Sequence, residues 1–184
     1  MGTLLFARGL RVPLGLVAWI AVVAGMTLSA VWAEAQAQAV RIVALGASNT
    51  YGQNAGGPPR AFPARLQALL KAKGHNVTIA NAGISGNTTA DMLRRLNSAV
   101  PQGTRIVIFG ACEGLFNNQR KGVSSGDSDI AAIKGRLQGR GIRVIEACGR
   151  GLPRGSDNIH LSSAGHAMLA NQLLPEVLGA LGKQ

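Results

Sequence analysis

The chain has 184 residues, of which 47% are hydrophobic, enough to fill the core of one ordinary domain without metals or disulfides. Its formal net charge is +11, but the basic residues are scattered and only 4% of residues are aromatic. This composition argues against a nucleic-acid binder that stacks bases on aromatic side chains, whereas peripheral contact with an anionic envelope surface stays open.

The first element in chain order is an export signal over residues 1–39. Arg8 and Arg11 form a short basic head, and a long uncharged apolar stretch follows. Small residues with Ala-x-Ala spacing then lead to Ala39, which is the pattern of a cleavable secretory signal peptide. The apolar stretch is also long enough to serve as an uncleaved membrane anchor. We therefore expect a periplasmic or secreted protein with one folded domain over residues 40–184.

After this signal, short apolar runs alternate with longer amphipathic ones. The predicted strands are residues 40–45, 77–80, 105–109 and 142–146. The predicted helices are residues 62–73, 89–99, 129–140 and about 162–181. Strand–helix alternation implies right-handed crossovers and a parallel sheet with helices on both faces. The predicted fold is a small three-layer α/β domain whose ligand site lies beyond the carboxyl ends of the strands.

Residues capable of chemistry follow the first two strands. The first strand ends in Gly46-Ala47-Ser48-Asn49, where the glycine allows a tight turn that presents Ser48 at the mouth of the sheet. The second strand leads to Gly83, whose backbone can approach a ligand closely and donate its N–H to a developing oxyanion. Each residue also has a purely structural explanation, Ser48 as a helix cap and Gly83 as a turn residue.

A carboxylate precedes a histidine by three residues in the segment from Asp157 to His160. The carboxylate can accept a hydrogen bond from one imidazole nitrogen, which leaves the other nitrogen free to take a proton from a serine hydroxyl. An aspartate cap beside a surface histidine is the structural alternative. The other two histidines, His75 and His166, are expected to face solvent.

Three motifs in this order, G-x-S-N, N-A-G-x-S-G-x-T-T and D-x-x-H, resemble the SGNH (GDSL-type) esterase/lipase family of acylhydrolases over essentially the whole mature chain. The resemblance implies a flavodoxin-like α/β/α sandwich, here with a four- to five-stranded parallel sheet. It implies Ser48 as nucleophile, His160 as general base and then acid, and Asp157 as the partner that orients His160. It also places the N–H groups of Ser48 and Gly83 in the oxyanion hole and requires no cofactor or metal.

The family's third motif, Gly-x-Asn-Asp after the third strand, is altered in this chain. The equivalent stretch is Gly110-Ala111-Cys112-Glu113, so Cys112 stands where the oxyanion-hole asparagine belongs. A second register places Asn117 there after a short insertion, and we prefer Asn117 because an amide donates a stronger hydrogen bond than a thiol. Cys112 and Cys148 both follow the ends of predicted neighbouring strands, so we expect a disulfide that pins the loop carrying Asn117.

The expected activity is hydrolysis of carboxylic esters through an acyl-Ser48 intermediate. Candidate substrates are small acyl or acetyl esters and lysophospholipid-like or thioester-like compounds. Two alternatives stay open. One is a non-catalytic envelope- or glycan-binding domain that lost activity with the altered third motif, and the other is an acyltransferase that uses the same triad with a sugar hydroxyl as acceptor.

Overall fold

The computed structural model describes residues 38–182, and the export signal expected over residues 1–39 falls almost wholly outside this range. Within the described part, none of the helices combines the length and the apolar character that crossing a membrane requires.

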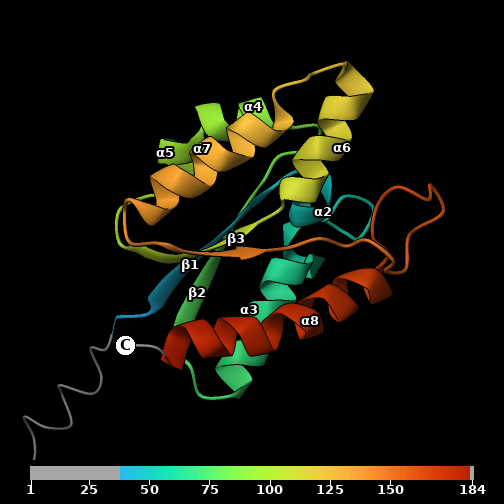
Figure 1. Ribbon diagram of the computed structural model, residues 1–184. Coiled ribbons are helices and arrows are strands. Elements are labelled where there is room, and N and C mark those ends of the chain that lie inside the picture. The colour runs from blue at the N-terminus through green and yellow to red at the C-terminus, as the bar shows by residue number, and fades with distance from the viewer. Residues whose placement is uncertain (1–37, 183–184) are drawn as a thin grey trace, which may run out of the picture. The chain divides into compact units, whose positions relative to one another are not determined.

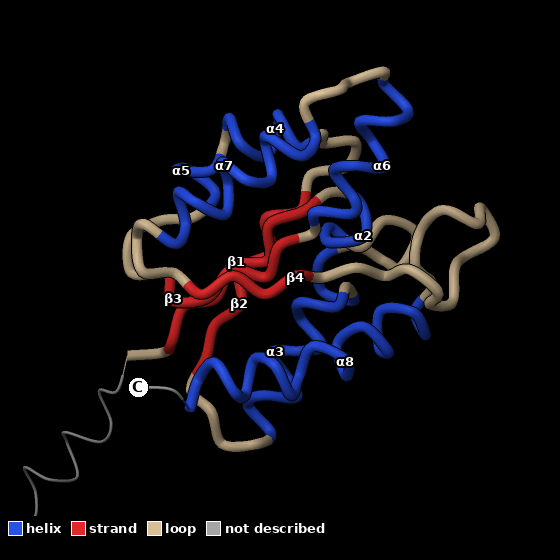
Figure 2. Tube along the Cα trace, viewed as in Figure 1, coloured by secondary structure: helices blue, strands red, loops and turns tan. Residues whose placement is uncertain are grey.

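Four parallel strands form one sheet in the order β2–β1–β3–β4. The strands are β1 (Val40–Gly46), β2 (Val77–Gly83), β3 (Thr104–Phe109) and β4 (Arg143–Glu146). Residues 42–45 of β1 are fully buried, as expected for an inner parallel strand with helices on both faces. The sheet confirms the predicted three-layer α/β fold, with four strands (Figure 2).

Helices cover the two faces of the sheet as separate layers (Figures 1 and 2). One layer holds α3 (Phe62–Ala72) and α8 (Ser163–Gly182), and the other holds α4 (Thr89–Arg94), α5 (Leu96–Ala99) and α7 (Gly126–Gln138). Successive strand residues point to opposite faces, so Ile42 packs in the core under α3 and α8, whereas Val43 packs in the core under α4 and α7. Each face of the sheet therefore has its own hydrophobic core.

The three remaining elements lie in the connections: α2 (Ser48–Tyr51), the 3-10 helix η1 (Pro58–Arg60) and α6 (Ala111–Lys121). Helix α6 was not predicted, and Asn117 lies on it rather than in a loop. Gly114 and the asparagines of this segment are weak helix formers, which hides the helix from propensity arguments. Packing explains the glycine, because a Cβ at Gly114 would lie 2.9 Å from Thr89 Cγ2.

Two further predictions need correction. The predicted helix over residues 89–99 is two helices, α4 and α5, that meet at Arg95. His166 does not face solvent. It is fully buried between α8 and α3, where its Nδ1 accepts a hydrogen bond from the Phe62 N–H at 3.2 Å and its ring stacks on Phe62. Residue 166 precedes Leu169, Ala170 and Leu173 by three, four and seven positions, so it lies on the buried face of α8, and helical spacing itself indicates the burial that the prediction overlooked.

Candidate active site

Ser48 begins α2 directly after β1, at the carboxyl edge of the sheet. The backbone of this turn lies against Gly83 of the neighbouring strand β2. A Cβ at Gly83 would lie 2.2 Å from the Tyr51 nitrogen and 2.8 Å from the Ala47 oxygen. Only glycine permits this close approach, so the motif glycine of the second strand is required to let the Ser48 turn pack on the sheet.

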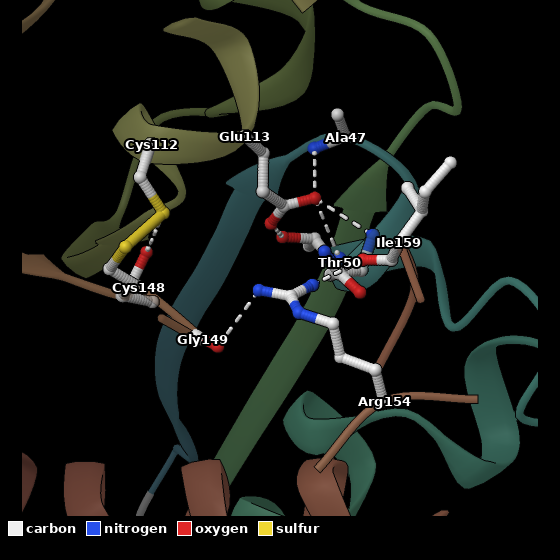
Figure 3. Close-up of a disulfide and its surroundings, with 10 residues drawn as sticks. Ala47, Thr50, Cys112, Glu113, Cys148, Gly149, Arg154 and Ile159 are labelled. Atoms are coloured by element: carbon white, nitrogen blue, oxygen red, sulfur yellow. Dashed lines mark hydrogen bonds between the residues drawn. A yellow bond between two sulfur atoms is a disulfide. The ribbon is translucent and has the colours of Figure 1, made fainter. Parts of the chain in front are cut away.

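A carboxylate that the sequence analysis did not assign holds the Ser48 turn in place. Glu113, on the first turn of α6, accepts hydrogen bonds at its Oε2 from the N–H groups of Ala47 (3.1 Å), Asn49 (2.8 Å) and Thr50 (3.1 Å). The Thr50 hydroxyl donates to Glu113 Oε1 at 2.6 Å, and Figure 3 shows the carboxylate directed at this turn. Burial raises the pKa of Glu113, and these hydrogen bonds partly oppose that rise.

The hydrogen bonds to Glu113 leave out one residue of the turn, Ser48 itself. Among residues 38–182, neither the Ser48 N–H nor its hydroxyl has a hydrogen-bond partner, although the N–H groups on both sides donate to Glu113. A fixed backbone N–H without an acceptor is what stabilisation of an oxyanion requires. The geometry therefore leaves both groups of Ser48 free for a substrate.

Asp157 and His160 form a hydrogen-bonded pair in the segment that leads to α8. Their Nδ1 and Oδ2 atoms are 2.6 Å apart, and Asp157 Oδ1 accepts the N–H groups of Ile159 and His160, each at 3.0 Å. The hydrogen bonds from His160 and Ile159 hold the pKa of Asp157 well below its ordinary value. An ionised Asp157 fixes His160 Nδ1 as the donor and leaves Nε2 to act as a base.

Two asparagines connect the Ser48 turn to this pair. Asn49 Oδ1 accepts the N–H of Leu161 at 2.7 Å, across 112 residues of sequence. Asn54 Nδ2 donates to Asp157 Oδ2 at 2.6 Å. No pattern in the sequence marks Asn54, and its left-handed φ of 62° is the kind of backbone that asparagine tolerates. No hydrogen bond joins His160 to Ser48 within the described residues, so the contact between nucleophile and base stays a prediction.

The other predicted oxyanion donors have partners of their own. The Gly83 N–H donates to Asn81 Oδ1 at 2.9 Å, and Asn117 Nδ2 donates to the Asn87 carbonyl at 2.8 Å. The oxyanion roles of Gly83 and Asn117 therefore stay predictions, while Cys112, the alternative register, is in a disulfide.

The disulfide joins Cys112 to Cys148, with their Cα atoms 5.8 Å apart. It ties the first turn of α6, next to Glu113, to the segment that follows β4 (Figure 3). The bond therefore holds the helix that carries Glu113 and its contacts to the Ser48 turn, in addition to Asn117 further along the same helix.

A pocket of about 420 Å³ opens beside these groups. Ser48, Asn49 and Glu113 form part of its lining, together with both cysteines of the disulfide. Leu115 and Phe116 of α6 contribute exposed apolar side chains to the same lining. The arrangement can receive a small acyl compound next to Ser48.

A sequence profile of the GDSL-like lipase/acylhydrolase family matches residues 44–156, more than half of the chain. The chain belongs to this family. It is therefore an ester-bond hydrolase, as its motifs predicted. The profile match includes Ser48, Gly83 and Glu113 but ends one residue before Asp157, so the assignment of Asp157 and His160 rests on their motif and their geometry.

Solved structures of other proteins resemble this chain and share its SGNH-hydrolase fold. The crystal structure of TesA superposes with a TM-score of 0.64 at 17% identity, covering 76% of this chain and 99% of that one. The psychrotrophic esterase EstA from Pseudoalteromonas sp. gives a TM-score of 0.62 at 14% identity, covering 78% and 99%. AlinE4, an SGNH-hydrolase family esterase, gives a TM-score of 0.54 at 25% identity, covering 78% of this chain and 73% of that one. No curated protein sequence matches the chain.

Proposed function

We propose that the protein hydrolyses carboxylic esters through an acyl-Ser48 intermediate, with His160 and Asp157 completing a catalytic triad. The observation that carries this proposal is the hydrogen-bonded Asp157–His160 pair, which the Asn49–Leu161 hydrogen bond ties to the Ser48 turn. A pair of this kind supplies a base with a fixed tautomer, and a fixed serine turn supplies the nucleophile.

In the proposed reaction the Ser48 hydroxyl oxygen attacks the ester carbonyl while its proton passes to His160 Nε2. The carbonyl oxygen becomes an oxyanion that accepts a hydrogen bond from the free Ser48 N–H. His160 then gives the proton to the leaving alcohol, and the acyl group stays on Ser48. Water, deprotonated by His160, attacks the acyl carbon and releases the carboxylate while the proton returns to Ser48.

The pocket supports substrates with small acyl groups, acetyl groups included, and lysophospholipid-like or thioester-like compounds fit the same chemistry. Its volume of about 420 Å³ is at the small end of ligand pockets. Leu115 and Phe116 offer apolar contact to a short chain.

Export to the periplasm or the exterior is part of the proposal. The signal pattern of residues 1–39 predicts it, and the Cys112–Cys148 disulfide supports it because disulfides persist in oxidising compartments. Without Arg8, Arg11 and Glu34 of the signal region, the formal net charge is +10, and this charge supports peripheral contact with an anionic envelope surface.

The test compares the wild type with Ser48→Ala on 4-nitrophenyl acetate, butyrate and octanoate. Ser85→Ala is the matched control, because Ser85 is an exposed serine of the neighbouring loop. We expect Ser48→Ala to lose hydrolysis while Ser85→Ala keeps it, and a fluorophosphonate adduct to map to Ser48 by mass spectrometry. A folded wild type that neither hydrolyses these esters nor forms the adduct would favour a binding domain, and transfer to an added alcohol would favour an acyltransferase.

A further inference from the structure

Two arginines line the pocket that contains Ser48. Arg150 and Arg154 both come from the segment between β4 and α8, and together with Ser48 they contribute to one pocket lining. Hydrolysis of a neutral ester by Ser48, His160 and Asp157 does not require either guanidinium group. Their position beside the proposed nucleophile therefore bears on which esters the pocket accepts.

The loop that carries Arg150 is fixed on both sides. Cys148 is tied to α6 by the disulfide. Arg154 donates from one nitrogen to the Gly149 carbonyl at 3.4 Å and from another to the Ile159 carbonyl, and Figure 3 shows its guanidinium between these two residues. Arg150 thus projects from a braced loop, so its charge stays near the pocket even though its side chain is exposed.

The charge of these arginines is not neutralised by the protein. Within residues 38–182, Arg150 makes no hydrogen bond or ion pair, and Arg154 bonds only to backbone carbonyls. Glu113 is the acidic residue of the pocket lining, and its two oxygens accept four hydrogen bonds from the Ser48 turn. Two guanidinium charges against one engaged carboxyl group give the pocket a field that favours anions.

The same pocket has an apolar part. The side chains of Leu115 and Phe116 are exposed, at 38% and 44%, and both belong to the lining. A ligand that satisfies the whole pocket therefore combines an apolar chain with an anionic group.

We propose that the site selects amphiphilic esters that carry a carboxylate or phosphate group, and that Arg150 is the residue that recognises this group. The inference rests on the proposed function and adds the substrate class to it. Arg150 is the stronger recognition residue because its five donors are free, whereas Arg154 is partly occupied in bracing the loop.

The experiment measures kcat/KM for matched anionic and neutral esters. In the first pair, phenyl acetate is neutral and 4-carboxyphenyl acetate carries a carboxylate in the leaving group. In the second pair, 4-nitrophenyl octanoate is neutral and mono(4-nitrophenyl) suberate carries a carboxylate in the acyl group. The variants are Arg150→Gln, Arg150→Lys and the control Arg143→Gln, which removes the same charge from β4 outside this pocket.

For at least one ester pair, we expect Arg150→Gln to lower the anionic-to-neutral ratio of kcat/KM about fivefold, the effect of one partly exposed ion pair. Arg150→Lys should restore part of the ratio, and salt at roughly 0.5 M should reduce it in the wild type by screening. The proposal would be overturned if Arg150→Gln left the ratio unchanged for both pairs, or if Arg143→Gln lowered it equally. General attraction by the net charge would then explain any preference for anionic esters.

A binding measurement separates this inference from the proposed function. Calorimetry on the Ser48→Ala protein compares hexyl phosphate with 1-hexanol, without need of turnover. If hexyl phosphate binds more tightly than 1-hexanol, and if Ser48→Ala/Arg150→Gln loses this preference, the anion site is supported even when no ester is hydrolysed. Equal binding of the two compounds, together with Ser48-dependent hydrolysis that has no charge preference, would overturn the inference alone.

Discussion

Replacing Glu113 with alanine removes the only group that holds the Ser48 turn from α6 among the described residues. Three backbone N–H groups then lose their acceptor, at about 1 kcal/mol each where pocket water can reach them, so we expect a loss of about 3 kcal/mol of unfolding free energy. For a domain of this size that corresponds to a decrease in Tm of about 10 °C. Because the nucleophile loses its fixed position, kcat should fall about 100-fold.

Glu113→Gln tests the same idea with a smaller change. Its amide oxygen can keep the three N–H groups, and its NH₂ can donate to the Thr50 hydroxyl, which only reverses one hydrogen bond. We expect it to keep most of the stability and activity. Glu146→Ala is the surface control, because Glu146 is exposed and pairs only with Lys134, so its loss should cost less than about 1 kcal/mol.

The assay is thermal unfolding together with kcat on a 4-nitrophenyl ester for each variant. If Glu113→Ala lowers Tm but keeps the wild-type kcat per folded molecule, Glu113 is only a structural residue and the positioning argument fails. If its Tm also stays at the wild-type value, the hydrogen bonds to the turn do not contribute to stability as argued here.

Three other predictions follow from the same contacts. Burial, with a smaller effect of Arg65, lowers the pKa of His166 from 6.5 to about 4. The unfolding free energy should therefore be highest above pH about 6.5 and fall by about 3 kcal/mol as the pH decreases toward 4, because the unfolded chain binds the proton more tightly. Urea unfolding at a series of pH values should show this decrease in the wild type and not in His166→Gln. Replacing both Cys112 and Cys148 with serine should lower the unfolding free energy by about 3 to 4 kcal/mol, because the disulfide closes a loop across 36 residues. A denaturant midpoint equal to that of the unreduced wild type would contradict this prediction. Asp157→Asn should lower kcat by about three to four orders of magnitude, because His160 loses its fixed tautomer; a rate within tenfold of the wild type would remove Asp157 from the triad.

The sequence allowed the fold and the outline of the site to be predicted, because both depend on local signals. Strand–helix alternation predicted the parallel sheet, and the residues around Ser48, Gly83 and His160 carried a recognisable order. The role of Glu113 could not be predicted from the sequence. Its role depends on α6 bringing it against a turn that lies more than 60 residues earlier in the chain, and the helix itself contains Gly114 and two asparagines of weak helix propensity.

The same limit applies to Asn54 but only in part to His166. Residue 166 shares helical spacing with the buried Leu169 and Leu173, so its burial could have been predicted, whereas its hydrogen bond to Phe62 depends on packing between α3 and α8. Asn54 acts on Asp157 across 103 residues. Long-range hydrogen bonds of single side chains leave no periodic signal, so they appear only when the fold is known.

The order of the site along the chain has a consequence for when the enzyme becomes active. Ser48 lies on the first connection after β1, whereas Asp157 and His160 follow the last strand, and the Asn49–Leu161 bond closes the gap between them. All four strands and both cysteines precede the proposed base in the chain. With Ser48, Asp157 and His160 in their proposed roles, the site is assembled only when the segment before α8 docks on the Ser48 turn, so activity would report that docking rather than formation of the sheet.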